Sequence, residues 1–164
     1  MLKRKAVKTL LIVGEGQDEV AFLNHVKQFP GVRGNGWQIT IRNAKGKGAA
    51  HVIDVARRHS QIADYDGVAA WFDTDTDWNV QAERVASKHR IQVVKSEPCL
   101  EALLLRVLGK QPGPDHQLKD QLAPFVDHRP AQSTSYKANF AQAALNAARA
   151  SEITLDEILQ LFRI

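Results

Sequence analysis

The 164-residue sequence contains one cysteine and no long hydrophobic run, and both deficits narrow the range of functions. A single thiol, Cys99, excludes an internal disulfide and a thiolate metal cluster, and it suits the reducing cytoplasm. No apolar stretch approaches the about 20 residues that a membrane-spanning helix needs. The segment after the basic residues 1–5 is too short and too strand-like for a signal peptide, and Glu15 interrupts it. We therefore expect a cytoplasmic protein that does not associate with membranes.

Repeats, low-complexity segments and zinc-ligand spacings are also missing, since the six histidines are scattered along the chain. The length fits one domain with a substantial core. We expect residues 1–164 to form this domain, with a core at about 8–110 and a helical C-terminal extension at about 111–164. The net charge of +4 and the pI near 9.3 permit a nucleic-acid partner, but many proteins without one are equally basic.

Short apolar runs alternate with helical patterns along most of the chain. Strands are predicted at 10–13, 37–42, 68–72 and 91–94. Helices are predicted at about 17–29, 49–58, 79–88 and 98–108, then a short one near 118–122 in a loop-rich segment, and again at 136–150 and 154–162. This alternation is typical of βαβ units with right-handed crossovers. The predicted fold is therefore α/β, a Rossmann-like parallel sheet of about four strands flanked by helices, with extra C-terminal helices.

An acidic residue, Glu15, stands between Gly14 and Gly16 directly after the first predicted strand. Ligands of open α/β sheets bind at the carboxyl ends of the strands. Glu19 follows one helical turn later, so it can face the same crevice. The glycines begin a dinucleotide fingerprint, but Glu19 replaces the third glycine and no phosphate-loop motif follows. Taken alone, Glu15 fits a turn residue as well as it fits a ligand.

Three aspartates, Asp73, Asp75 and Asp77, follow the strand at 68–72 at alternate positions. Like charges at the end of a buried strand are costly unless a cation neutralises them, and carboxylate oxygens are the ligands that Mg²⁺ or Mn²⁺ selects. We therefore expect these aspartates to meet Glu15 around metal ions. The alternative is a solvated acidic turn in which Asp77 or Thr76 caps the next helix.

Two other families of site can be compared with the aspartate cluster. An EF-hand loop requires glycine where Trp78 stands and glutamate where Arg84 stands, so it is excluded. The Asp-x-Asp pattern also resembles phosphatases of the haloacid-dehalogenase type, although that pattern has threonine or valine at the position of Asp77. A metal-dependent phosphatase therefore stays an alternative.

The order of the two acidic clusters resembles the TOPRIM domain, which topoisomerases, primases and OLD-type nucleases share. Further motifs make the chain similar to the RloB-like group, which is associated with OLD proteins and phage resistance. The matching segments are Glu15-Gly16-x-x-Glu19, the loop from Lys45 to Gly48, Phe72-Asp73-x-Asp75, the block from Ser96 to Leu105, and Tyr136-Lys137. The resemblance covers nearly the whole chain and implies a TOPRIM-like fold.

The resemblance also implies a Mg²⁺- or Mn²⁺-dependent site that cleaves phosphodiester bonds in DNA or RNA. Two metal ions can together activate water and stabilise a leaving oxygen. The implied metal ligands are Glu15, Glu19 and Asp73 for one ion, Asp75 with Ser96 or Glu101 for a second, and Asp77 beside them. The implied catalytic residues are Glu15, Asp73, Asp75 and Lys137. The lysine would offset charge on the phosphate.

Several of these candidates also have a purely structural interpretation. Lys137 fits a solvated helix residue, Glu101 can pair with Arg106 on the same helix, and Ser96 can cap the helix that follows it. Lys45 and Lys47, on a glycine-rich loop, are alternative phosphate-binding residues. The competing function is a non-catalytic TOPRIM-fold module, either regulatory or for binding, that acts with a protein partner in a defence system.

Overall fold

The computed structural model describes residues 6–75 and 77–164. Four parallel strands form a sheet in the order β2-β1-β3-β4. The strands are β1 (Lys8–Gly14), β2 (Trp37–Asn43), β3 (Gly67–Asp73) and β4 (Ile91–Ser96). The α/β class and the four-stranded parallel sheet predicted from the sequence are confirmed.

The two central strands are buried on both faces. Leu11, Ile12 and Val13 of β1 are inaccessible to solvent, and so are Trp71 and Phe72 of β3. Parallel strands covered on both faces have continuous apolar runs rather than alternating ones, because no side of the strand meets water. This explains the continuous apolar runs from which both strands were predicted.

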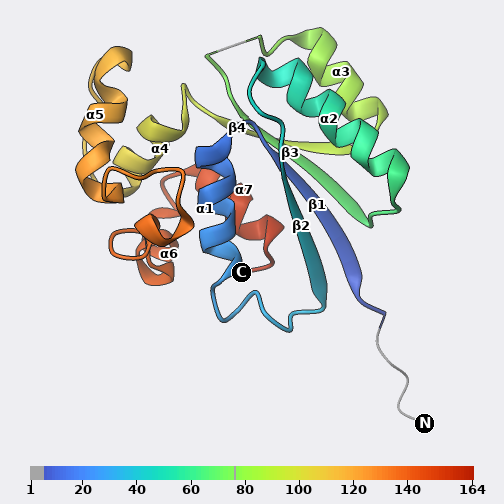
Figure 1. Ribbon diagram of the computed structural model, residues 1–164, viewed down its shortest axis with the longest axis horizontal. Coiled ribbons are helices and arrows are strands. Elements are labelled where there is room, and N and C mark those ends of the chain that lie inside the picture. The colour runs from blue at the N-terminus through green and yellow to red at the C-terminus, as the bar shows by residue number, and fades with distance from the viewer. Residues whose placement is uncertain (1–5, 76) are drawn as a thin grey trace.

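Helices cover both faces of the sheet (Figure 1). One face carries α1 (Gln17–Lys27), α4 (Leu100–Val107), α5 (Leu118–Leu122), α6 (Gln142–Ala148) and α7 (Ile153–Leu161); the other carries α2 (Gly48–Ile62) and α3 (Val80–Lys88). Each face has its own buried cluster, with Phe22, Trp71 and Tyr136 in the first and Val52 and Phe72 in the second. Across the described residues, no helix combines the length and the apolar character needed to cross a membrane.

The C-terminal part differs from the predicted helix at 136–150. Short 3₁₀ turns, η1 (Asp115–Gln117), η2 (Ala123–Val126) and η3 (Ser133–Tyr136), connect the helices, and α6 starts only at Gln142. The rings of Tyr136 and Phe140 both pack edge-on against Phe22, at centroid distances of 5.5 and 6.4 Å. The Tyr136 hydroxyl also donates to the carbonyl of Pro130 at 2.7 Å. These contacts hold a turn where local propensity indicated a helix.

The start of α4 also differs from the prediction. Cys99 is the N-cap residue and the helix begins at Leu100, so Pro98 precedes the helix instead of occupying its first turn. Ser96 is the last residue of β4 and does not cap the helix, which corrects the capping interpretation. Its Oγ accepts a hydrogen bond from the indole N–H of Trp71 at 2.7 Å in the core.

Candidate metal centre

Two glutamates lie at the carboxyl end of β1: Glu15 follows the strand directly, and Glu19 is in the first turn of α1. The N-terminus of α1 packs closely on the strand, since a Cβ at Gly14 would lie only 3.2 Å from the Cβ of Glu19. Glu19 is buried, and its Oε2 accepts a hydrogen bond from the Gly16 N–H at 2.9 Å. Glu15 Oε2 accepts a hydrogen bond from the Asp73 N–H at 2.9 Å. Glu15 therefore connects the ends of the two central strands directly.

The end of β3 is hydrogen-bonded to the start of α4. Asp73 Oδ1 accepts a hydrogen bond from the Leu100 N–H at 3.0 Å, in the first turn of the helix. The carboxylate thus satisfies one of the backbone donors that a helix start leaves unpaired. The backbone N–H groups of Thr74 and Asp75 donate to the carbonyl of Pro98 at 3.1 and 3.3 Å. These bonds hold the aspartate-bearing turn against the connection between β4 and α4.

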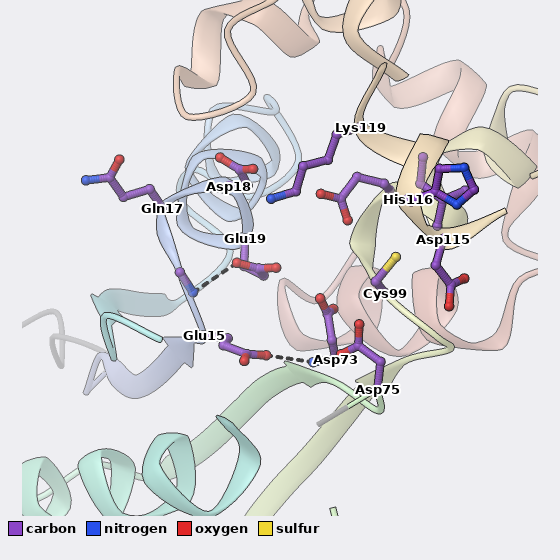
Figure 2. Close-up of a pocket in the computed structure, with 13 residues that line it drawn as sticks. Glu15, Gln17, Asp18, Glu19, Asp73, Asp75, Cys99, Asp115, His116 and Lys119 are labelled. Atoms are coloured by element: carbon purple, nitrogen blue, oxygen red, sulfur yellow. Dashed lines mark hydrogen bonds between the residues drawn. The ribbon is translucent and has the colours of Figure 1, made fainter. Parts of the chain in front are cut away.

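A cavity of about 550 Å³ opens where these elements meet (Figure 2). Its acidic side chains come from four separate segments: the start of α1, the turn after β3, the start of α4 and η1. The lining residues are Glu15, Gly16, Gln17, Asp18, Glu19, Asp73, Asp75, Cys99, Glu101, Asp115, His116, Leu118 and Lys119. Figure 2 shows Glu15, Glu19, Asp73 and Asp75 on one side of it, with Asp115, His116 and Lys119 opposite.

Protonation of the carboxyl groups reflects their burial and crowding. Burial raises the pKa of Asp73 to about 9, and the neighbouring charges of Glu19 and Glu15 add to the rise. Burial also raises the pKa of Glu19 to about 7 despite its hydrogen bond from Gly16. The pKa of Glu15 is raised by burial and by Asp75, against the opposing effect of the Asp73 N–H. Near neutral pH the protein alone therefore keeps Asp73 protonated and Glu19 partly protonated, and a bound cation would take the place of these protons.

The chemistry of the donor set fits a hard divalent ion. All the acidic side chains offer oxygen, the ligand atom of Mg²⁺ and Mn²⁺. Burial and the neighbouring Glu101 raise the pKa of Cys99 to about 12, so its sulfur is a neutral thiol in the metal-free protein. Within residues 6–75 and 77–164, however, no three His, Cys, Asp or Glu side chains stand ready to hold one ion. A metal ion would therefore require rotation of the more exposed carboxylates, of which Asp75 is one.

The cavity includes five of the seven metal ligands suggested by the sequence: Glu15, Glu19, Asp73, Asp75 and Glu101. Ser96 is fully buried and does not line the cavity. Asp77 is directed elsewhere: its Oδ1 accepts a hydrogen bond from the Ala49 N–H at 2.6 Å, at the start of α2. Asp77 therefore caps α2, whereas Asn79 caps the helix that follows it, α3.

The lysines suggested by the sequence do not line the cavity. Lys45 and Lys47 are exposed, with φ angles of 62° and 69°, on the loop between β2 and α2. The loop touches the site through its backbone, because the Gly46 N–H donates to the Glu15 carbonyl at 2.7 Å. Lys137 is exposed at the end of η3 and lines separate surface hollows with residues such as Phe125 and His25.

Glu101 lines the cavity, and Arg106, its proposed partner, is paired with other residues. Arg106 pairs with Glu152 at 2.9 Å and donates to the carbonyl of Glu97 at 3.0 Å. The interpretation of Glu101 as the intrahelical partner of Arg106 is therefore wrong. Its charge also raises the pKa values of Asp18 and Asp73.

Asp18, Asp115, His116 and Lys119 are among the lining residues that were not anticipated. Asp18 lies inside the Glu15-to-Glu19 motif, three residues after Glu15, and helical spacing could have indicated it. Asp115, His116 and Lys119 come from the loop-rich segment after α4. No local pattern marks them, because only the packing of α5 on α4 brings them to the sheet edge.

No protein-family model matches the chain, and neither a curated protein nor a solved structure gives a significant match.

Proposed function

We propose that the chain is a Mg²⁺-dependent nuclease of the TOPRIM type, which hydrolyses phosphodiester bonds of DNA or RNA. One observation carries the proposal: Glu15, Glu19, Asp73, Asp75 and Glu101 meet in one cavity at the carboxyl ends of β1 and β3. The order of acids after the strands is the one that underlies the resemblance to TOPRIM domains. The RloB-like motifs extend the proposal to a cytoplasmic role in phage defence.

Each acidic residue has a definable role in such a site. Glu15 and Asp73 would hold a metal ion, and the backbone N–H groups of Asp73 and Leu100 fix the orientation of their carboxylates. Buried Glu19 would join them after losing the proton that its raised pKa favours near neutral pH. Asp75 and Glu101, which line the same cavity, would serve a second ion. Bound divalent ions supply activation of water and stabilisation of the leaving oxygen.

The second candidate is a non-catalytic TOPRIM-fold module that binds or regulates a protein partner. It is favoured by the finding that no three potential ligands among the described residues stand ready for one metal ion. A module of this kind would keep the fold and some metal affinity without turnover. The phosphatase alternative differs in substrate, because it would act on small phosphomonoesters.

A titration of Mg²⁺ and Mn²⁺ followed by calorimetry and melting temperature tests the proposal. The variants are Glu15→Gln and Asp73→Asn, because each keeps an oxygen that can accept its present backbone hydrogen bond. Glu83→Gln is the matched control, since Glu83 is exposed on α3 and does not line the cavity. We expect metal binding in the wild type and the control and its loss in both site variants.

Cleavage assays then separate the three functions. We expect metal-dependent cleavage of plasmid DNA or of RNA, and a loss of at least about 100-fold in Asp73→Asn, the scale on which removal of a charge-stabilising group acts. Metal binding without cleavage, together with capture of a stoichiometric partner, would favour the regulatory module. Turnover of p-nitrophenyl phosphate without polynucleotide cleavage would favour the phosphatase. Absence of metal binding in a folded wild type would eliminate the nuclease.

A further inference from the structure

The wall of the cavity opposite the strand ends is built from the C-terminal segment. Leu118 and Leu122 of α5 are buried, at 3% and 2% exposure, and anchor the helix in the core beside α4. The loop before it is held by Gln121, which accepts a hydrogen bond from the Gly113 N–H at 2.8 Å and donates to the Gln111 carbonyl at 2.9 Å. These contacts fix the position of α5 and therefore of the residues it directs towards the strand ends.

Lys119 is the residue of α5 that brings positive charge to the cavity. The lining contains seven acidic residues, this one lysine and no arginine. In Figure 2 its side chain extends from α5 toward Asp18. Burial and the charge of Glu101 raise the pKa of Asp18, whereas the charge of Lys119 lowers it. The positive charge of Lys119 therefore acts on a carboxyl group of the cavity.

The ammonium group of Lys119 is not committed to a structural contact. Among residues 6–75 and 77–164, no carboxylate lies within 4.0 Å of it and no hydrogen bond holds it. Arg106 and Arg149, which do pair with acids, do not line this cavity. A lysine that faces seven carboxyl groups without pairing is placed to meet an incoming anion.

Lys137, the lysine favoured by the sequence motif, has different surroundings. Like Lys119 it is exposed, but it lies beside His25, whose pKa is lowered by burial and further by the Lys137 charge. It lines hollows formed by 124–139 and by 25–30 with 141–142, and none of the strand-end carboxylates lines either hollow. Its charge is therefore not directed at the site where the phosphate would react.

We propose that Lys119, and not Lys137, binds a non-bridging oxygen of the substrate phosphate. This inference rests on the proposed function. Bound metal ions would approach the phosphate from the side of the strand ends, and Lys119 would hold it from the side of α5. A charged donor on a phosphate oxygen gives a strong hydrogen bond and offsets the repulsion from the carboxylates. The C-terminal segment would then form the wall of the substrate site that faces the strand ends.

Binding of labelled oligothymidylate and oligouridylate, measured by fluorescence anisotropy in Ca²⁺, tests the inference separately from turnover. The variants are Lys119→Gln, Lys119→Arg and, as the matched control, Lys137→Gln. We expect Lys119→Gln to raise the Kd by about tenfold, the effect of losing about 1.4 kcal/mol. Lys119→Arg should keep part of the affinity, and Lys137→Gln should stay within about twofold of the wild type.

Calorimetric titration of Mg²⁺ into the same variants identifies the cause of any loss. We expect Lys119→Gln to bind Mg²⁺ at least as tightly as the wild type, because a positive charge has left an acidic cavity. Unchanged oligonucleotide binding in Lys119→Gln, or an equal loss in Lys137→Gln, would overturn the inference while the nuclease proposal stands. A wild type that binds metal but neither oligonucleotide would overturn both.

Discussion

Glu15 Oε2 accepts a hydrogen bond from the backbone N–H of Asp73 at 2.9 Å, so the carboxylate that follows β1 is oriented by the neighbouring strand, β3. The Asp73 carboxylate in turn accepts a hydrogen bond from the Leu100 N–H of α4. The carboxylates of Glu15, Glu19 and Asp73 are thus held by backbone donors. Backbone donors orient carboxylates without neutralising them, which leaves the charge for a cation to compensate.

The stability of the metal-free protein should fall as pH rises. Asp73 and Glu19 have pKa values of about 9 and 7 in the folded protein, above the about 4 of an unfolded chain. Between about pH 4 and pH 9 the native state therefore holds more protons than the unfolded state, and the free energy of unfolding decreases with pH. We expect the melting temperature in EDTA to decline across this window. A constant or rising melting temperature would contradict the raised pKa values.

The stabilisation by Mg²⁺ should show the opposite trend. Metal binding needs the deprotonated carboxylates, so binding releases protons and tightens as pH rises. We expect the Mg²⁺-dependent increase in melting temperature to be larger at about pH 9 than at about pH 6. Calorimetry in buffers of different ionisation enthalpy should show proton release at the lower pH. An equal increase at both pH values would indicate binding outside the Asp73 and Glu19 pair.

Asp73→Asn should stabilise the metal-free protein and abolish its response to Mg²⁺. The amide oxygen can still accept the hydrogen bond from Leu100, and the amide needs no proton on folding, whereas Asp73, with a pKa of about 9, must take one up. We expect a gain of about 0.5–2 kcal/mol in the free energy of unfolding near pH 8, a typical gain where a functional site is held at the expense of stability. Urea denaturation in EDTA measures it. A loss of stability would show that the carboxylate is chiefly structural.

Asp77 should stabilise α2 and should not contribute to metal binding. Its Oδ1 accepts a hydrogen bond from the Ala49 N–H at 2.6 Å, a capping contact at a helix start. We expect Asp77→Ala to lower the free energy of unfolding by about 0.5–2 kcal/mol. Asp77→Asn is the matched control, because it keeps the acceptor oxygen and should lose less. Mg²⁺ binding should be unchanged in both variants. Loss of Mg²⁺ binding would show that Asp77 is a metal ligand.

The sequence indicated the part of the site that depends on local pattern and sheet topology. Apolar runs locate β1 and β3, and the carboxyl ends of parallel strands meet at one edge, so Glu15 and Asp73 were expected to converge. The same logic failed for Asp77. Alternate spacing implies a shared side only while the strand continues, but β3 ends at Asp73 and the chain then turns.

The opposite wall could not be inferred, because it depends on packing between distant segments. Lys119 reaches the cavity only because Leu118 and Leu122 are buried against the core beside α4. Two leucines four residues apart predict a short buried helix, but they do not indicate where it docks. A lysine on such a helix has no local feature that separates it from a solvated one.

Gly48→Ala should be more costly than Gly46→Ala, although both glycines have φ near +81°. The shared backbone conformation penalises any residue with a Cβ, by about 1–2 kcal/mol. A Cβ at Gly48 would also collide with the carboxylate of Asp77, whereas a Cβ at Gly46 meets nothing within 4 Å. We expect Gly48→Ala to lower the free energy of unfolding by this strain plus the loss of the Asp77 cap. Equal losses in the two variants, measured by urea denaturation, would show that Asp77 moves aside without cost and that the cap contributes little.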